Sequence, residues 1–422
     1  MLYDSLMKAA SSAGISAASR IVSALIVNKI AAIYIGPTGF ALIGQFQNFS
    51  AIVLAIGGNC YSNGIVRGVV EARDRGEQAV SSIISTCLVV VVSSSALVAT
   101  VIYLGRGLVV QYLLGGGLQT ASLVFAIFIV PLNLHYAILA LLNGLKDAKK
   151  FAVINACAGT LTVIVGCVLI PTLGLVGAVL TPIVANGLAC VAGYYGLTKI
   201  VRIRGNPDLR VVDRQTIRQL FRFGAGALAT LSIAPLSALA IRGILLSREM
   251  YTEAGYWHAI TKVSESYMLP LAMLMSMHYL PRFTRLRLDS ALYNRAIYSG
   301  IAQVLGGVMV IGAGLFVFRD VAIVTLLSRA FSPMRDMVFS QTMGDAFRGV
   351  VLLLENALLA RGLVRSCFTA ELVFWSIFVL SLSVVIQFYP VGLTITYVYW
   401  GSAIAAAWVA FRLATTGAWV RQ

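Results

Sequence analysis

Residues 23–40 read SALIVNKIAAIYIGPTGF, and the second half of the chain repeats this pattern as SALAIRG at 237–243 and AGY at 254–256. In both copies, an apolar run that carries one cation is followed by a short break and a glycine–aromatic start to the next run. LGRGLVVQYLLG at 104–115 likewise resembles VFRDVAIVTLLS at 317–328, and both read as short interfacial segments. An internal repeat of this kind predicts a fold built from two similar halves.

The composition sets the class of protein. Apolar residues make up 59% of the 422 residues and charged residues only 11%, against roughly 25% charged in a soluble domain. No soluble fold of this length can bury so much apolar surface, so we predict an all-α polytopic membrane protein. The six cysteines form no CxxC pair, and the three histidines show no ligand spacing. We therefore expect no metal site and no cofactor.

Twelve apolar runs, each of about 20 residues or more, predict about twelve transmembrane helices. The predicted spans are 9–35, 38–66, 79–104, 119–145, 150–171, 174–199, 220–246, 254–281, 293–317, 333–360, 365–388 and 392–415. Most Lys and Arg residues fall on one side of the membrane when both termini are placed in the cytoplasm, which satisfies the positive-inside rule. The net charge of +16 is then explained by topology and contact with anionic lipids, and we expect no nucleic-acid partner.

The repeat and the spans together predict two six-helix lobes. Six spans is an even number, so both repeats enter the membrane in the same orientation, related by an axis along the membrane normal. We predict an N-lobe at 1–200, a basic cytoplasmic linker at 201–219 and a C-lobe at 220–422, with Asp213 placed to cap the helix after the linker. A MATE-like arrangement of two lobes around a central cleft usually works by alternating access.

Five cations and four acids fall inside the predicted spans, where charge is costly and marks candidate functional residues. The cations are Arg20, Lys29, Arg242, Lys262 and Arg348, and the acids are Glu265, Asp345, Glu355 and Glu371. Arg20 lies near the midplane, whereas Lys29 and Arg242 lie nearer the outer ends of their spans and are explained about as well by snorkelling. Lys262 with Glu265, and Asp345 with Arg348, have the i,i+3 spacing of ion pairs, which are either structural or cavity-lining.

Side-chain amides collect in the second span. They are Gln45, Gln47, Asn48, Asn59 and Asn63, and the pair Gly57–Gly58 between them predicts a bend. Amides and aromatic rings suit a sugar, because amides exchange hydrogen bonds with hydroxyls and rings stack on sugar faces. The alternative, polar contacts that hold helices together, explains the amides almost as well.

Three stretches carry a family resemblance: GPTGFALIGQFQNFSAIVLAIGGNCYSNGIVRGVVE at 36–71, AGYWHAITKVSESYMLPLAMLMSMHYLPRFTRL at 254–286, and FRDVAIVTLLSRAFSPMRDMVFSQTMGDAFRG at 318–349. They resemble the Wzx-type flippases, the O-antigen translocases and lipid III flippases of the multidrug/oligosaccharidyl-lipid/polysaccharide exporter superfamily. The resemblance covers essentially the whole chain in order. Where the lipid III flippases align with Arg, this chain has Gln47, so one cationic contact is lost or moved to Arg20 or Lys29.

The resemblance implies a MATE-like flippase in a bacterial inner membrane. Its substrate would be an undecaprenyl-pyrophosphate-linked oligosaccharide, moved from the cytoplasmic to the periplasmic leaflet. The five cations would bind the pyrophosphate, and the five amides, with Tyr256, Trp257 and His258, would contact the sugars. Glu265, in the S-x-S-[DE]-x-Y stretch, and Asp345, in GD, match acidic positions of the family and are candidates for ion or proton coupling.

Two other functions compete with this hypothesis. A cation- or proton-coupled multidrug exporter of the same fold needs a cavity dominated by acids and aromatic rings, which the first half lacks. A membrane glycosyltransferase or polymerase needs a sizeable periplasmic loop with catalytic groups, and the outer loops here are short. We therefore expect a protein that is not an enzyme, with membrane lipids and other polysaccharide-assembly membrane proteins as further partners.

Overall fold

The structure is a computed structural model of the chain, and it describes residues 2–109, 111, 118–204 and 213–416. Throughout these residues the secondary structure is helical, and they contain no strand. Eight helices in this part of the chain are long and apolar enough to cross a membrane. The prediction of an all-α polytopic membrane protein is therefore confirmed.

Contacts divide the chain into two compact units. Unit 1 comprises Met1–Ile35 and Leu42–Leu236, and unit 2 comprises Gly36–Ala41 and Ser237–Gln422. The later boundary falls inside one continuous helix, α8 (Arg214–Leu246), next to Pro235. Proline lacks the N–H that would close a helical hydrogen bond, so α8 is weakened where the units meet in sequence. The predicted lobe limits stay predictions, and the middle of the predicted linker, 205–212, lies outside the described residues.

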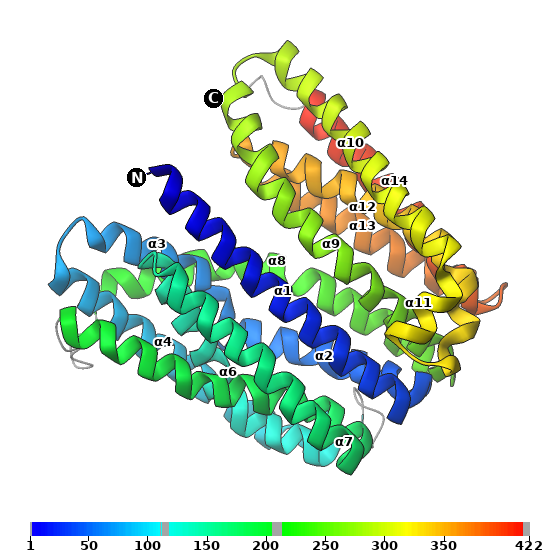
Figure 1. Cartoon of the computed structure of the whole chain (residues 1–422), viewed down its shortest axis with the longest axis horizontal. Coiled ribbons are helices and arrows are strands. Elements are labelled where there is room, and N and C mark those ends of the chain that lie inside the picture. Colours follow the sequence, from blue (N-terminus) through cyan, green and yellow to red (C-terminus); the bar gives the residue numbers. More distant parts are fainter. Residues whose placement is uncertain (1, 110, 112–117, 205–212, 417–422) are drawn as a thin grey trace. The chain divides into compact units, whose positions relative to one another are not determined.

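Unit 1 is a helical bundle. Its helices are α1 (Leu2–Tyr34), α2 (Gly36–Gly57), α3 (Ser62–Arg73), α4 (Glu77–Leu104), α5 (Arg106–Leu108), α6 (Gln119–Gly144), α7 (Ala148–Arg204) and the first part of α8. The helix α7 packs against both α1 and α6 (Figure 1). It contains a kink at Gly174, whose φ of +56° is open to glycine but strained for other residues. The two halves of α7 correspond to the predicted fifth and sixth spans.

The second span is broken where the Gly57–Gly58 pair predicted a bend. α2 ends at Gly57, a single 3₁₀ turn (η1, Asn59–Tyr61) follows, and α3 begins at Ser62. The break leaves the Gly57 carbonyl without its helical partner, and the hydroxyls of Ser94 and Ser95 on α4 donate to it at 2.7 and 2.8 Å. These serines let a helix break inside the bundle without an unsatisfied carbonyl.

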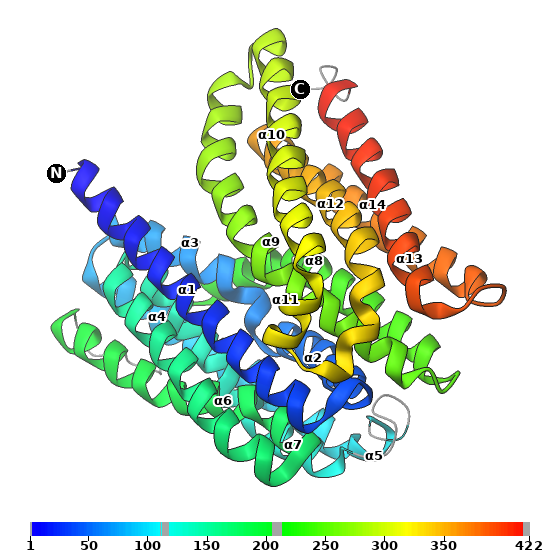
Figure 2. The same ribbon diagram turned by 45° about the vertical axis from the view of Figure 1, so that its right-hand side comes forward.

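Unit 2 is a second bundle, with α12 at its centre. Its elements are the end of α8, α9 (Tyr251–Leu286), α10 (Ser290–Val317), α11 (Arg319–Leu326), the 3₁₀ segment η3 (Arg329–Asp336), α12 (Met337–Ala360), α13 (Val364–Val385) and α14 (Val391–Thr416). α12 contacts α9, α10, α13 and α14, and Figure 2 shows α10, α12 and α14 side by side. With α7 taken as two spans and α2–α3 as one, the long helices of both units coincide with the twelve predicted spans.

The start of α2 belongs to unit 2 rather than unit 1. Phe40 packs its ring edge-on against Phe331 at 5.0 Å and tilted against His258 at 5.9 Å between ring centroids. α9 also approaches this segment very closely, because a Cβ at Gly255 would lie 1.8 Å from the Pro37 carbonyl oxygen. The glycine before Tyr256, which the repeat singled out, is therefore required by backbone packing.

Candidate functional site

A polar cavity of about 470 Å³ lies within unit 1, lined by α1, α3, α6, α7 and η1. Its volume falls in the range of small-molecule sites, roughly 300–1,000 Å³. Five side-chain amides and one guanidinium group face it: Asn59, Asn63, Asn143, Asn155, Asn186 and Arg20. His135, Tyr136 and three hydroxyl residues add further hydrogen-bonding groups. The wall therefore offers many neutral donors and acceptors around a single permanent charge.

Helix geometry fixes several of these side chains. The Nδ2 atoms of Asn155 and Asn186 each donate to a backbone carbonyl one turn earlier in α7, at 3.0 and 2.7 Å. Ser23 donates to the Ser19 carbonyl in the same way. α1 and α7 can approach here because residue 159 is glycine, where a Cβ would lie 2.9 Å from both serine hydroxyls. The cavity wall is thus built from packed helices, which hold its polar groups in place.

Arg20 gives the cavity its electrostatic character. None of the described residues forms an ion pair or a hydrogen bond with its side chain, and none of the described lining residues is acidic. A guanidinium group presents a fork of N–H donors that matches phosphate oxygens and is more weakly hydrated than an ammonium group. The cavity therefore suits an anionic phosphate group attached to something rich in hydroxyls.

The structure brings together only part of the predicted amide set. Asn59 and Asn63 line the cavity with Arg20, as the sequence hypothesis required. Gln45, Gln47 and Asn48 are not among its lining residues, and Gln45 is buried with an Oε1 atom that no described residue hydrogen-bonds.

The sequence hypothesis missed three asparagines of the cavity wall, Asn143, Asn155 and Asn186. The three are far apart in sequence and each is flanked by apolar or small residues, so no local pattern marks them. The one available signal was an amide in the middle of a predicted span.

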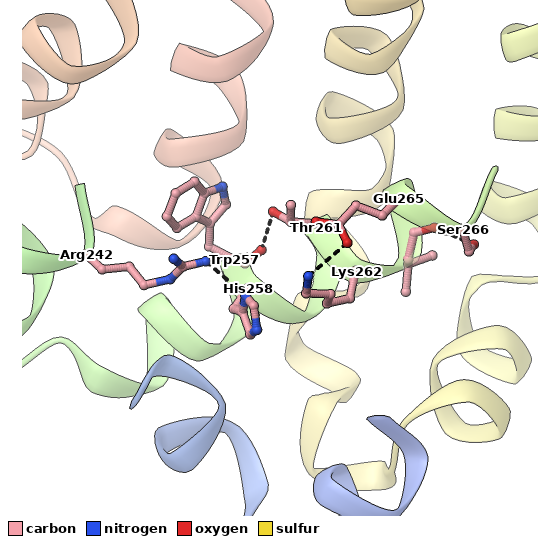
Figure 3. A network of polar contacts seen from close by, with 8 residues as sticks. Arg242, Trp257, His258, Thr261, Lys262, Glu265 and Ser266 are labelled. Carbon is pink, nitrogen blue, oxygen red and sulfur yellow. Dashed lines mark hydrogen bonds and ion pairs between the residues drawn. The ribbon is translucent and has the colours of Figure 1, made fainter. Parts of the chain in front are cut away.

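Unit 2 holds a network of polar contacts around the first half of α9, drawn in Figure 3. Arg242, from α8, is 3% exposed, and its Nη2 atom lies 2.8 Å from His258 Nδ1 while its guanidinium stacks 4.9 Å from the centre of the Trp257 ring. Arginine can only donate, so the His258 Nδ1 atom accepts and the imidazole is neutral. One turn along α9, Lys262 Nζ lies 2.8 Å from Glu265 Oε2. The ion pair that the i,i+3 spacing predicted is therefore present.

Tyr256, the remaining predicted aromatic contact, lies at the edge of this region. Its hydroxyl donates to the Ala330 carbonyl at 3.4 Å, and its ring meets Phe331 edge-on. Trp257 and His258 are buried against Arg242, so the three aromatic side chains do not form one open surface.

Asp345 on α12 is 1% exposed and is enclosed by donors rather than by a cation. Its Oδ1 atom accepts from the Tyr399 hydroxyl at 2.7 Å and from Gln341 Nε2 at 3.2 Å, and its Oδ2 atom accepts from the Tyr267 hydroxyl. These donors come from α9, α12 and α14, so the carboxyl group ties three helices together. The expected pairing of Asp345 with Arg348 is absent, because the tyrosines and Gln341 occupy both carboxyl oxygens.

Arg348 turns instead toward α13. Its Nη2 atom lies 2.8 Å from Glu371 Oε1, and its guanidinium stacks 4.2 Å from the centre of the Phe374 ring. Trp375 Nε1 donates to the other Glu371 oxygen at 3.1 Å. The Arg348 guanidinium is therefore engaged by residues of α13. Arg242 and Lys262 are likewise engaged, by His258 and Glu265 respectively. Lys29 also interacts with a group of the protein, whereas Arg20 forms neither an ion pair nor a hydrogen bond with any of the described residues.

Comparison with known proteins supplies the family. The model of a family described as polysaccharide biosynthesis protein matches residues 8–287, more than half of the chain. The chain belongs to the polysaccharide biosynthesis protein family. This family member is 26% identical over 373 residues to the lipid III flippases of Escherichia coli K12 and Shigella flexneri, covering 87% of its own length and 88% of theirs. The resemblance to Wzx-type flippases is confirmed.

Solved structures of transporters share the fold of this polysaccharide biosynthesis family member. A multidrug resistance MATE family transporter of the MOP superfamily matches with a TM-score of 0.80 and 11% identity over 94% of each chain. The lipid II flippase MurJ matches with a TM-score of 0.72 and 12% identity, over 96% of this chain and 87% of its own. At these identities the likeness establishes the fold alone. The predicted MATE-like fold of a multi-pass membrane protein is confirmed.

Proposed function

We propose that the chain is a flippase, not an enzyme, that moves an undecaprenyl-pyrophosphate-linked oligosaccharide from the cytoplasmic to the periplasmic leaflet of a bacterial inner membrane by alternating access. Membership of the polysaccharide biosynthesis family and the alignment with two lipid III flippases over most of both chains support this substrate class. The sugars of the repeat unit are left open by both observations.

The main support for the proposal is the polar cavity of unit 1 that Arg20 and the five asparagines line, which we call the amide cavity. Arg20 would bind the pyrophosphate, and the five asparagines would exchange hydrogen bonds with sugar hydroxyls, because an amide supplies both donors and an acceptor. The polyprenyl chain would stay in lipid. Asp345 and Glu265 remain proposed coupling residues, with Asp345 favoured because it is the more buried carboxyl group.

A cation- or proton-coupled multidrug exporter is the main rival, since a multidrug resistance MATE family transporter shares the fold. A cation would need a carboxylate to offset its charge, and none of the described residues of the amide cavity is acidic. The cavity therefore favours an anionic, hydroxyl-rich substrate.

The test is flipping by the purified chain in proteoliposomes that contain a fluorescent undecaprenyl-pyrophosphate-linked glycan. Arg20→Ala is expected to slow flipping roughly 10- to 100-fold, the range of one hydrogen bond to a charged group. The flipping rate of Arg20→Lys should lie between those of the wild type and Arg20→Ala, because lysine keeps the charge but loses the fork of donors. Arg106→Ala is the matched control, because Arg106 is an exposed unit 1 arginine whose side chain, among the described residues, contacts Tyr103. Equal rates for Arg20→Ala and the control would refute the site, and cation efflux without flipping would refute the function.

A further inference from the structure

Unit 1 contains a second polar cavity, of about 270 Å³, which shares no lining residue with the amide cavity. It lies between α3, α4 and the first part of α8. Two arginines, Arg67 and Arg222, line it together with Glu71, Thr216 and Gln219. The proposed flipping site makes no use of this cavity, which we call the basic pocket.

The basic pocket holds guanidinium groups that the protein does not fully engage. Arg67 Nε lies 2.7 Å from Glu71 Oε1, and its guanidinium stacks 4.9 Å from the centre of the Phe223 ring. This leaves both Nη atoms of Arg67 without a hydrogen-bond partner among the described residues. Arg222 has neither an ion pair nor a hydrogen bond within the same set. Two cations against one carboxylate give the pocket a net positive charge.

The walls of the basic pocket are held in place, because the start of α8 is anchored to α4. The Asp213 side chain caps the start of α8 by accepting from the Thr216 N–H at 2.9 Å. The Asp213 N–H in turn donates to the hydroxyl of Thr86 on α4, at 3.1 Å. The walls contributed by α4 and α8 are therefore fixed relative to each other within unit 1.

The surroundings of the basic pocket point to a lipid. Phe223 lines it with 38% of its surface exposed, and aromatic rings of this kind concentrate at membrane–water interfaces. The positive-inside rule places this end of α3 and α8 at the cytoplasmic face. Basic pockets between transmembrane helices on that side recognise anionic lipid head groups. A phosphate between the two arginines and an acyl chain against the Phe223 ring would satisfy both kinds of surface.

We propose that the basic pocket binds the phosphate group of an anionic glycerophospholipid of the cytoplasmic leaflet. The phosphate accepts hydrogen bonds from the Nη atoms of Arg67 and from the guanidinium of Arg222. Bound lipid thereby connects α3 with α8, the helix that continues into unit 2. This binding is independent of the flipped substrate, because the two cavities have no residue in common.

The experiment measures binding of short-chain phosphatidylglycerol to the delipidated full-length chain by native mass spectrometry. Phosphatidylcholine is the zwitterionic comparison, and inorganic phosphate is added as a competitor. The double variant Arg67→Ala/Arg222→Ala is expected to bind phosphatidylglycerol roughly 30-fold more weakly, from about one charge interaction per arginine. The control Arg214→Ala/Arg218→Ala removes two exposed α8 charges outside the pocket and should weaken binding less than about threefold.

A third variant keeps all the charges and fills the pocket. A Cβ at residue 68 meets only Ile83, at 3.8 Å, so Gly68→Leu is expected to fold and to block the lipid. Binding that survives both this variant and the double arginine variant would overturn the proposal. If the control Arg214→Ala/Arg218→Ala lost as much phosphatidylglycerol affinity as Arg67→Ala/Arg222→Ala, binding would reflect diffuse charge attraction and the proposed site would be refuted. Equal binding of phosphatidylcholine, or full displacement by inorganic phosphate, would overturn the assignment to an anionic lipid.

Discussion

Arg348→Ala is expected to destabilise the chain far more than Arg67→Ala, although each removes an ion pair of almost equal length. Arg348 lies 2.8 Å from Glu371 with side chains 15% and 18% exposed, whereas Arg67 lies 2.7 Å from Glu71 with side chains 62% and 39% exposed. Water solvates the carboxylate that Arg67 leaves behind. The carboxylate that Arg348 leaves behind is only 18% exposed, and Glu355 beside Glu371 adds a second acid, whose Oε1 atom is buried without a hydrogen-bond partner among the described residues.

The two losses differ in size. Removing one partner of a buried ion pair costs about 3–5 kcal/mol, and an exposed pair contributes about 0.2–1 kcal/mol. Both arginines also stack on a phenylalanine, which adds about 0.5–1 kcal/mol at the exposed site and more at the buried one. We therefore expect the free energy of unfolding to fall by at least about 2 kcal/mol more for Arg348→Ala than for Arg67→Ala.

The assay is unfolding of the purified chain in mixed micelles titrated with sodium dodecyl sulfate, followed by circular dichroism. The double variant Arg348→Leu/Glu371→Leu should recover most of the stability that Arg348→Ala loses, because it removes the unpaired charge along with the pair. A stable Arg348→Ala variant that no longer flips substrate would refute this reasoning, and Arg348 would then be a ligand rather than a packing residue.

Two further predictions concern positions away from the cavities. Gly255→Ala places a Cβ 1.8 Å from the Pro37 carbonyl oxygen, so we expect a loss of roughly 3 kcal/mol in the same unfolding assay; Gly307→Ala, in open space on α10, should be neutral or slightly stabilising. At Asp213 the pKa lies below its ordinary value of 3.8, first because the Thr216 hydroxyl donates to the carboxylate. Asp213→Ala should therefore cost about 0.5–2 kcal/mol at neutral pH, and the difference from wild type should shrink as the pH falls below about 4, through the folded pKa, since only the ionised cap stabilises. A constant difference from pH 7 to 3 would contradict the assignment.

The sequence predicted the fold well because its signals are local. Each span is a continuous apolar run, and the break in the second span follows from two adjacent glycines, Gly57 and Gly58. The Lys262–Glu265 pair was also predictable, since both residues stand on one face of α9, about one turn apart. Local spacing decides an interaction when no other helix offers a better partner.

The same spacing rule misled at Asp345 and Arg348, and the reason lies in tertiary packing. Tyr399 on α14 and Tyr267 on α9 reach the Asp345 oxygens, while Glu371 on α13 reaches Arg348. None of these partners is near in sequence. Asn143, Asn155 and Asn186 were missed for a related reason, since they lie far apart in the sequence on α6 and α7 and come together only when the helices pack.

The continuity of α8 limits the insertions and deletions that the protein can tolerate. Each residue turns an α-helix by about 100°, so inserting one residue between Ser237 and Arg242 would rotate Arg242 by that angle relative to the part of α8 before it in unit 2. Its guanidinium would then leave His258 and Trp257, although no side chain of unit 2 had been changed. Insertions and deletions between Ser237 and Arg242 are therefore expected to be excluded, even where single substitutions in the same stretch are accepted. The rotational phase of one helix thus constrains the length of the chain within unit 2.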